Sequence, residues 1–228
     1  MCGIAGLINF DKSKIQLNLL KKMQRSLHHR GPDANGIFIE NNIGLVHTRL
    51  SIIDLSKKAD QPMTSRDKRY VLIYNGEIYN FKKLRSELLK KKIRFLTNSD
   101  TEVVLNSLIH YGPTIIKKFN GMFAFVLYDK KEKTFLLARD RYGIKPLYYT
   151  LTNNFFSFSS EQKAILENPN FNKKLNLKGL KEYFTFQNFF SNETFFENIN
   201  TFPAGNYAYL DLNDKKKLNF NEFWDFDF

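Results

Sequence analysis

Two runs of short strand-like segments, separated by two adjacent helical segments, constrain the fold of this chain more than any other feature. The first run comprises residues 3–10, 36–40, 43–48, 50–54 and 70–75. The second run comprises residues 121–128, 134–139, 147–151 and 155–159. Such runs favour antiparallel sheets with the helices packed outside them. The sequence therefore predicts an α+β fold.

Apolar residues at helical spacing indicate where the helices lie. They recur every four positions within residues 13–29, which predicts a helix with Ser13 as its N-cap. The expected apolar face of this helix is formed by Ile15, Leu19, Met23 and Leu27. The other predicted helical segments are residues 80–91, a helix that begins at Ser99 or Asp100 and stops at Gly112, a turn at 161–166, and 177–186. Residues 206–212 and 217–223 are predicted to form a closing hairpin.

The composition is that of a globular protein. The chain has 228 residues, of which 43% are hydrophobic and 25% charged, with no repeat or flexible linker, so a single domain over residues 1–228 is expected. No apolar run approaches the ~20 residues of a membrane span, and no basic leader opens the chain, so a cytoplasmic location without a membrane partner is expected. The single cysteine excludes an internal disulfide and a multi-thiolate zinc site, and no metal is expected.

The formal net charge of +12 has two interpretations. It is compatible with a nucleic-acid partner. It is better explained by a solvated lysine-rich surface, since Lys, Asn, Ile and Phe are all abundant, as in chains encoded by AT-rich codons. The lysines occur as short scattered runs, such as 90–92 and 215–217, with no nucleic-acid-binding motif around them. We therefore expect no nucleic-acid partner.

Cys2 is the first candidate for chemistry. A lone cysteine at the head of an apolar strand is usually a small buried hydrophobe. Its position suggests a second interpretation, because removal of Met1 would leave the thiol and a free α-amine on one residue. The α-amine titrates near pH 8 in model peptides, so it can serve as the general base for the thiol. Cys2 alone would then supply both nucleophile and base.

Further along the chain are residues suited to an acyl-transfer site that accepts an amino acid. Asn75 offers a side-chain amide and Gly76 a close backbone N–H to a developing oxyanion, although Asn-Gly is also a strong hairpin signal. Arg49 is a candidate for binding a carboxylate, because a guanidinium binds it bidentately. Glu77 and Asp100 are candidates for an ammonium group, although Asp100 could equally serve only as a helix cap.

An ordered series of motifs resembles one known family. The motifs are MCGIAG (1–6), RGPD (30–33), HTRLSIID (47–54), QPM (61–63), NGEIYN (75–80), SDTE (99–102), GMFAF (121–125), RDRYGIKPLYY (139–149), SSE (159–161) and FPAG (202–205). Each motif alone is weak, but the ordered set is specific and covers nearly the whole chain. Together they resemble the class II glutamine amidotransferase domain of glutamine-hydrolysing asparagine synthetase.

That resemblance implies a fold, an activity and a set of site residues. The fold would be a four-layer αββα sandwich of the N-terminal-nucleophile hydrolase type. The activity would be hydrolysis of L-glutamine to glutamate and ammonia through a thioester on Cys2. Asn75 and Gly76 would form the oxyanion hole. Glutamine would be bound by Arg49, the backbone of Leu50, Ser51, Ile52 and Ile53, and by Asn75, Gly76, Glu77 and Asp100.

The resemblance extends only to the first part of asparagine synthetases. ATP and Mg2+ would belong to the absent synthetase domain, and the glutaminase half is expected to need no cofactor. A synthetase domain is therefore an expected partner, in cis or in trans, and a homodimer is possible. The aromatic ending, residues 222–228, is expected to pack against another surface, which could belong to that missing domain.

Other functions remain open on the sequence alone. Glucosamine-6-phosphate synthase and amidophosphoribosyltransferase also begin with a nucleophilic cysteine, but residues 49–54 and 75–80 resemble the asparagine synthetase branch better. Enzymes that amidate sugars of surface polysaccharides share this branch, so the acceptor of the ammonia need not be aspartate. A non-catalytic regulatory module with the same fold is a further alternative.

Overall fold

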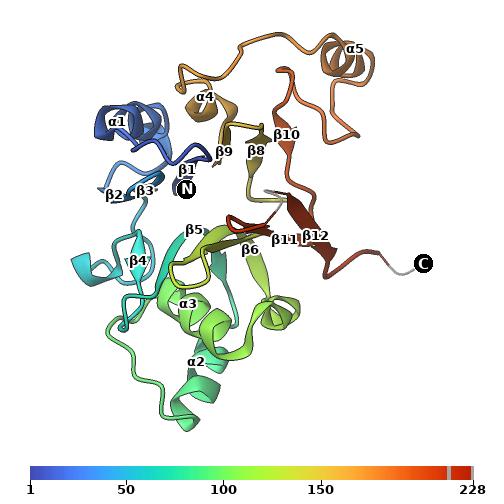
Figure 1. Cartoon of the computed structure of the whole chain (residues 1–228). Coiled ribbons are helices and arrows are strands. Elements are labelled where there is room, and N and C mark those ends of the chain that lie inside the picture. The colour runs from blue at the N-terminus through green and yellow to red at the C-terminus, as the bar shows by residue number, and fades with distance from the viewer. Residues whose placement is uncertain (215–216, 227–228) are drawn as a thin grey trace.

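The computed structural model describes residues 1–214 and 217–226, and its centre is a pair of six-stranded antiparallel sheets (Figure 1). The first sheet has the order β10 (Asn200–Thr201), β8 (Tyr148–Leu151), β9 (Phe155–Ser159), β1 (Gly3–Asn9), β3 (Ile43–Arg49), β2 (Ala34–Glu40). The second has the order β12 (Leu218–Glu222), β11 (Asn206–Asp211), β7 (Thr134–Arg139), β6 (Gly121–Asp129), β5 (Tyr70–Ile78), β4 (Met63–Thr64). The predicted antiparallel sheets are confirmed.

Helices cover the outer face of each sheet. Figure 1 shows α1 (Leu17–Ser26) and α4 (Gln162–Ile165) beside the first sheet, and α2 (Phe81–Lys90) and α3 (Asp100–Tyr111) beside the second. A fifth helix, α5 (Leu177–Phe186), lies apart from both layers. Three short 3-10 helices complete the elements: η1 (His28–Arg30), η2 (Lys57–Ala59) and η3 (Pro113–Lys118). The expected four-layer αββα sandwich is therefore confirmed.

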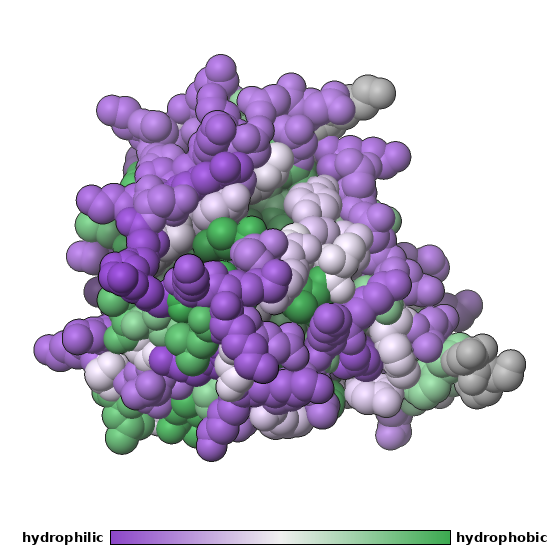
Figure 2. Space-filling model, turned by 90° about the horizontal axis from the view of Figure 1, so that it is seen from below, coloured by the Kyte–Doolittle hydropathy of each residue, from purple (hydrophilic) through white to green (hydrophobic). Residues whose placement is uncertain are grey.

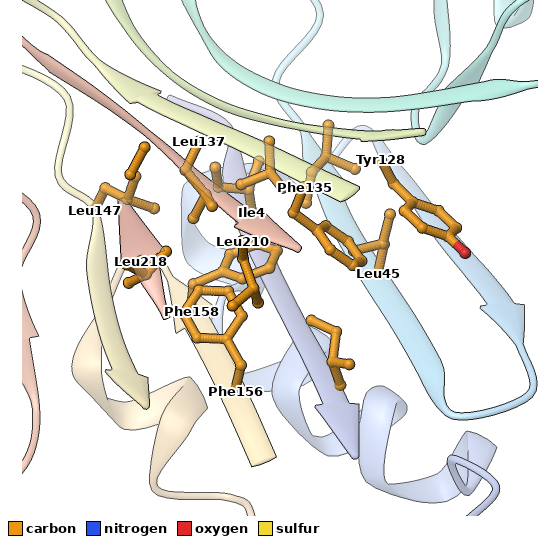
Figure 3. Packing of buried hydrophobic residues seen from close by; sticks show 14 of the residues in the cluster. Ile4, Leu45, Tyr128, Phe135, Leu137, Leu147, Phe156, Phe158, Leu210 and Leu218 are labelled. Carbon is orange, nitrogen blue, oxygen red and sulfur yellow. The ribbon is translucent and has the colours of Figure 1, made fainter. Parts of the chain in front are cut away.

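Three hydrophobic clusters fill the spaces between these layers. The cluster between the two sheets combines side chains from both, including Phe158 of β9 and Phe135 of β7 (Figure 3). A second cluster joins β5 and β6 to α2 and α3, and a third joins β1 and β3 to α1 and α4. Each fully buried phenylalanine contributes roughly 1.5–3 kcal/mol to folding, so this packing fixes the ends of the strands that carry the site.

Residues 50–54 do not form the predicted strand. The chain leaves the sheet after Arg49 and continues as an irregular loop. Two of its backbone amides bind side chains instead of a neighbouring strand: the Leu50 N–H donates to Cys2 Sγ and the Ser51 N–H to Asp33. Asp54 adopts a left-handed conformation, with φ of 54°, which ends any extended run.

Several helix and strand boundaries also differ from the prediction. The first helix begins at Leu17 after Gln16, and Ser13 is not its N-cap, because the Ser13 hydroxyl accepts a hydrogen bond from Asn9. Its buried side includes Leu20, whereas Leu19 is only partly buried. Ser99 is the N-cap of α3, accepting a hydrogen bond from the Glu102 N–H. The two-residue strands β4 and β10 escaped prediction because they carry no periodic signal of their own.

The aromatic ending packs in part on this chain itself. Phe223 is buried and stacks on Phe123, with ring centroids 6.3 Å apart. Trp224 meets Tyr142 edge to face, with centroids 4.9 Å apart. Asp227 and Phe228, like Lys215 and Lys216 of the predicted lysine run, lie outside the described residues. The described part of the ending therefore has a partner within the domain.

The face of the molecule shown in Figure 2 is mostly hydrophilic, and its hydrophobic residues gather in separate patches. Within the part of the chain that the structure describes, no helix is both long and apolar enough to cross a bilayer.

Candidate active site

One end of the sandwich brings together residues from both sheets. Cys2 precedes β1, Arg49 ends β3, and Asn75 and Gly76 lie near the end of β5. They line a pocket of about 140 Å³, a space suited to part of a small molecule. All the site residues predicted from the sequence line this pocket except Ser51, whose backbone N–H instead binds Asp33 with an N···O distance of 2.7 Å.

Cys2 is held in place through its backbone and its sulfur. Arg30 donates from Nε to the Cys2 carbonyl oxygen at 3.0 Å, and also binds Glu161 at 2.9 Å. The thiol donates to the Leu50 carbonyl, and the Leu50 N–H lies 3.4 Å from Sγ. Burial raises the pKa of the Cys2 thiol, so activation of this sulfur needs a nearby base or cation.

The α-amine in this structure belongs to Met1, directly beside Cys2. Burial lowers the pKa of that amine below its ordinary value, which favours the neutral form that can accept a proton. Lys145 lines the same pocket, and its ammonium lies 3.1 Å from the Met1 sulfur. An amine on the first residue and a lysine ammonium therefore both lie close to the thiol.

Asn75 and Gly76 form part of a strand and not a hairpin turn. Asn75 pairs with Ala124 and Gly76 with Phe123 in the β5–β6 ladder. A Cβ on Gly76 would lie 2.4 Å from the Met122 carbonyl oxygen, so only glycine fits there. The buried Asn75 Nδ2 makes no hydrogen bond to any described residue although it lines the pocket. A buried donor left unpaired costs about 1–3 kcal/mol, so a bound acceptor would satisfy it.

Arg49 forms one wall of the pocket, but its guanidinium is partly engaged. Nη1 binds the Asp60 carboxylate at 2.7 Å and the Ser56 carbonyl oxygen at 3.1 Å, and Nη2 binds the Asp54 carbonyl oxygen. These bonds tie the loop after β3 to the buried end of the strand. Arg49, the predicted carboxylate-binding residue, therefore lines the pocket and also holds the loop that closes one side of it.

Asp100 and Glu77 place two carboxyl groups on the pocket. Asp100 Oδ2 accepts from the Tyr74 hydroxyl at 2.8 Å and the Ile78 N–H at 3.1 Å. Burial raises the pKa of Asp100, so a ligand cation beside it would restore the charged form. Because Ser99 caps α3, Asp100 is free of the capping role that the sequence left open. Glu77 lines the same pocket from β5 and is partly buried.

Two residues that support the site, Gln61 and His47, were given no chemical role from the sequence. Gln61 binds both backbone groups of Tyr74, its Oε1 accepting at 2.6 Å and its Nε2 donating at 3.2 Å. His47 Nε2 lies 3.2 Å from the Tyr74 carbonyl oxygen, and burial lowers the pKa of His47 to about 3, so its ring is neutral. Both residues lie in motifs quoted above, which was the available signal. Among the described residues no group of three or more His, Cys, Asp or Glu could hold a metal ion.

The Glu161 carboxylate gives a stability prediction. Burial opposes its ionisation, but hydrogen bonds from Arg30, Lys163 and His29 lower the pKa of Glu161 to about 2. A carboxyl with a depressed folded-state pKa stabilises the protein above its unfolded pKa, about 4.5, and this contribution is lost as the pH falls through about 2. We expect Glu161→Gln to lower the free energy of unfolding by about 1–2 kcal/mol at pH 7, after allowance for solvent screening.

Urea unfolding at pH 7 and pH 3 would measure this effect. The difference between wild type and Glu161→Gln should shrink at pH 3, where the native advantage of the carboxylate is partly lost. Glu222→Gln is the matched control, since Glu222 is exposed and makes no ion pair within residues 1–214 and 217–226. An equal loss at both pH values would contradict the ionic origin of the effect.

Comparison with known proteins agrees with this geometry. A family model described as "Glutamine amidotransferase domain" matches residues 1–224. A putative glutamine-hydrolysing asparagine synthetase of Methanocaldococcus jannaschii is 38% identical over 99% of this chain and 47% of its own length. Asparagine synthetase 1 of Bacillus subtilis, also glutamine-hydrolysing, is 40% identical over 82% of this chain and 30% of its own length. The chain thus spans less than half the length of these relatives.

Solved structures support the fold. Glutamine phosphoribosylpyrophosphate amidotransferase from Bacillus subtilis, complexed with ADP and GMP, superposes with a TM-score of 0.71 at 16% identity, over 98% of this chain and 49% of the other. At this identity the likeness concerns the fold alone, which is of the N-terminal-nucleophile hydrolase type. With the family match over residues 1–224, the chain belongs to the class II glutamine amidotransferase domain family and is related to the asparagine synthetases.

Proposed function

We propose that this domain hydrolyses L-glutamine to glutamate and ammonia through a thioester on Cys2. The observation that carries the proposal is the shared pocket of the Cys2 sulfur and the unpaired, buried Asn75 amide. A nucleophile and an empty oxyanion donor on one pocket are the two parts that acyl transfer requires. The family to which the chain belongs uses glutamine, which names the substrate.

The reaction begins once Met1 has been removed and the α-amine belongs to Cys2. The amine takes the thiol proton, and the thiolate attacks the side-chain amide carbon of glutamine. The oxygen of the tetrahedral intermediate accepts hydrogen bonds from Asn75 Nδ2 and the Gly76 N–H. The α-ammonium returns its proton to the leaving nitrogen, and the C–N bond breaks to release ammonia. Water then attacks the thioester carbonyl, and glutamate leaves as the thiol is restored.

The charged lining of the pocket suits the α-carboxylate and α-ammonium of glutamine. Arg49 offers a cation at the end of β3, while Asp100 and Glu77 offer carboxyl groups from α3 and β5. An ammonium group beside Asp100 would lower the raised pKa of this carboxyl and so favour its ionised form. The ionised carboxylate then binds a cationic ligand in preference to a neutral one. Leu50, Ile52 and Ile53 of the loop after β3 line the same wall, whereas the Ser51 N–H binds Asp33.

We further propose that residues 1–228 form the glutaminase half of a larger activity. The relatives named above are called asparagine synthetases and are more than twice as long as the matched segment. The ammonia would then serve a synthetase domain that uses ATP and Mg2+ to activate aspartate, in cis or in trans. A surface-polysaccharide sugar is the alternative acceptor, because the pocket residues are assigned to glutamine and none of them identifies the molecule that receives the ammonia.

Release of glutamate and ammonia from glutamine by the untagged protein tests the proposal. Intact mass must first show that the chain begins at Cys2. We expect equimolar glutamate and ammonia, and at most weak turnover of asparagine, whose shorter side chain would not reach Cys2 while its charged groups stay bound. A chain with a verified Cys2 terminus that forms no thioester and releases no glutamate would overturn the proposed activity of the isolated domain.

A further inference from the structure

A second cleft lies at the opposite end of the sandwich from the candidate active site. Strand β1 runs from Gly3, next to Cys2, to Asn9, and β6 runs from Gly121 to Asp129. Beyond their far ends opens a cleft of about 600 Å³, between the loop after β1, the β2–β3 turn and the β6–β7 turn. At about 3.3 Å per residue, the length of β1 separates the two sites by roughly 20 Å. The volume is typical of a site for a small molecule.

The cleft carries an excess of positive charge. Its lining includes four lysines, Lys12, Lys14, Lys130 and Lys133, and a single carboxylate, Glu40. Glu40 is already engaged, because it binds Lys130 Nζ at 2.7 Å and is hydrogen-bonded to the Tyr128 hydroxyl. Lys12, Lys14 and Lys133 form no ion pair with any described residue. Cations around a concave surface focus the field and favour a multiply charged anion.

The backbone presents two of these lysines at unusual positions. Lys12 has φ of 63° and Lys133 has φ of 54°, left-handed conformations in which glycine or asparagine is more usual. The turns that carry them are fixed by side-chain bonds: Asn42 Nδ2 donates to the Asn9 carbonyl oxygen at 2.7 Å, and Asn213 Nδ2 to the Glu132 carbonyl oxygen at 3.0 Å. The ammonium groups therefore project from anchored turns rather than from loose loops.

The floor of the cleft is apolar and aromatic. It is formed by Phe10, Ile43, Leu212 and the Tyr128 ring, which stacks on Phe135 with centroids 4.6 Å apart. Figure 3 shows Tyr128 at one end of the labelled core residues, with its hydroxyl directed away from them. Phe10, Ile43 and Tyr128 are at most 9% exposed, so the lysine ammonium groups offer a ligand its main contacts.

We propose that this cleft binds a small phosphate-bearing molecule with at least two negative charges. Pyrophosphate and a nucleoside di- or triphosphate share this chemistry, and their relative affinities distinguish them. The site is independent of the glutaminase reaction, because none of its residues lines the pocket that contains Cys2. The lysines surround a single cleft and do not follow an extended path, as the backbone of a nucleic-acid strand would require.

Isothermal titration calorimetry with pyrophosphate and with ATP tests the site. It is performed with EDTA present, at low salt and at 150 mM salt. Sulfate at equal ionic strength is the control anion. The double variant Lys12→Asn/Lys133→Asn removes two ammonium groups and introduces asparagine, which tolerates the left-handed backbone at both positions. Lys14→Gln removes one ammonium group at a position where the backbone φ is not positive. Lys82→Gln/Lys83→Gln is the matched control, since both lysines are exposed on α2 and unpaired among described residues. Melting temperatures show whether each variant is folded.

We expect one molecule of pyrophosphate or ATP per chain, at least tenfold weaker binding in the cleft double variant, a smaller loss in Lys14→Gln, and no change in the control. Tighter binding of ATP than of pyrophosphate would identify a nucleotide, and equal binding would identify the phosphate groups as the whole ligand. Equal loss in the control, binding of sulfate as tight as that of pyrophosphate, or no submillimolar binding by wild type would overturn the proposal.

Discussion

Replacement of Cys2 by alanine should abolish glutamine hydrolysis by this domain. No other thiol could replace the proposed nucleophile, because Cys2 is the only cysteine in the chain. Loss of a covalent nucleophile typically costs about 10⁵-fold or more in kcat, which would bring the rate to background. The measurement is glutamate release under saturating glutamine, with an electrophilic glutamine analogue and intact mass to record a single covalent adduct on wild type.

Two further variants separate the thiol from the amine. Cys2→Ser keeps the shape and the α-amine but lowers nucleophilicity, so it should retain only a trace of activity. An uncleavable N-terminal extension keeps the thiol but removes the free amine, and its kcat should fall by about 10²–10⁴-fold, the usual contribution of a general base. Full activity of the extended protein would show that another group, such as Lys145, takes the thiol proton.

The sequence predicted the layers of this fold because its periodic patterns are local. Residues 177–186 form the helix α5 with the predicted bounds, since an apolar pattern and the Asn176 cap lie within a few residues of each other. Gly112, with φ of 68°, stops α3 as predicted, because a left-handed C-terminal residue is favoured by glycine. Signals of this kind need no knowledge of distant contacts.

Where prediction of the fold was wrong, the deciding contact lies elsewhere in the chain. Residues 50–54 look like a strand by composition, but Asp33 accepts the Ser51 N–H and Arg49 binds the Asp54 carbonyl oxygen. The Asn75-Gly76 pair, for which the sequence left a hairpin turn open as an alternative, lies within the β5–β6 ladder. The Asp33 contact and the β6 ladder come from residues more than ten positions away, and such tertiary partners override the local preference.

The sequence motifs predicted the site residues as a set, but not the hydrogen bonds and ion pairs that these residues form. The family motifs place Arg49 and Asp100 at the pocket, and the structure brings both there. The bond from Arg49 to Asp60, and the Tyr74 hydroxyl on Asp100, depend on how β3, β5 and α3 meet. The lysine cleft was invisible in the sequence, because its lining is drawn from residues 10 to 213 and has no local motif.

Truncation of Asn75 is expected to give the second large loss of activity. Asn75→Ala removes the proposed oxyanion donor Nδ2, and loss of one such donor typically costs about 10²–10³-fold in kcat. KM should change little, since the bond to the developing oxygen strengthens only in the transition state. Asn75→Asp should be at least as impaired, because it replaces the donor by an acceptor of similar shape. Steady-state kinetics with glutamine would separate kcat from KM.

The stability of Asn75→Ala provides an independent readout. Its Nδ2 is buried without a partner in the described structure, so truncation removes an unsatisfied donor at the same time as some packing. We expect the free energy of unfolding to change by less than about 1 kcal/mol, although activity falls a hundredfold or more.

Asn168 offers a matched control for this argument. It is as buried as Asn75, at 1% exposure, and its Nδ2 is likewise unpaired among the described residues, but it does not line the pocket of Cys2. Asn168→Ala should therefore leave kcat unchanged. If both variants lost activity equally, the loss would come from general disturbance of the fold. If Asn75→Ala kept the wild-type kcat, the oxyanion would be bound by backbone groups such as the Gly76 N–H and not by the Asn75 amide.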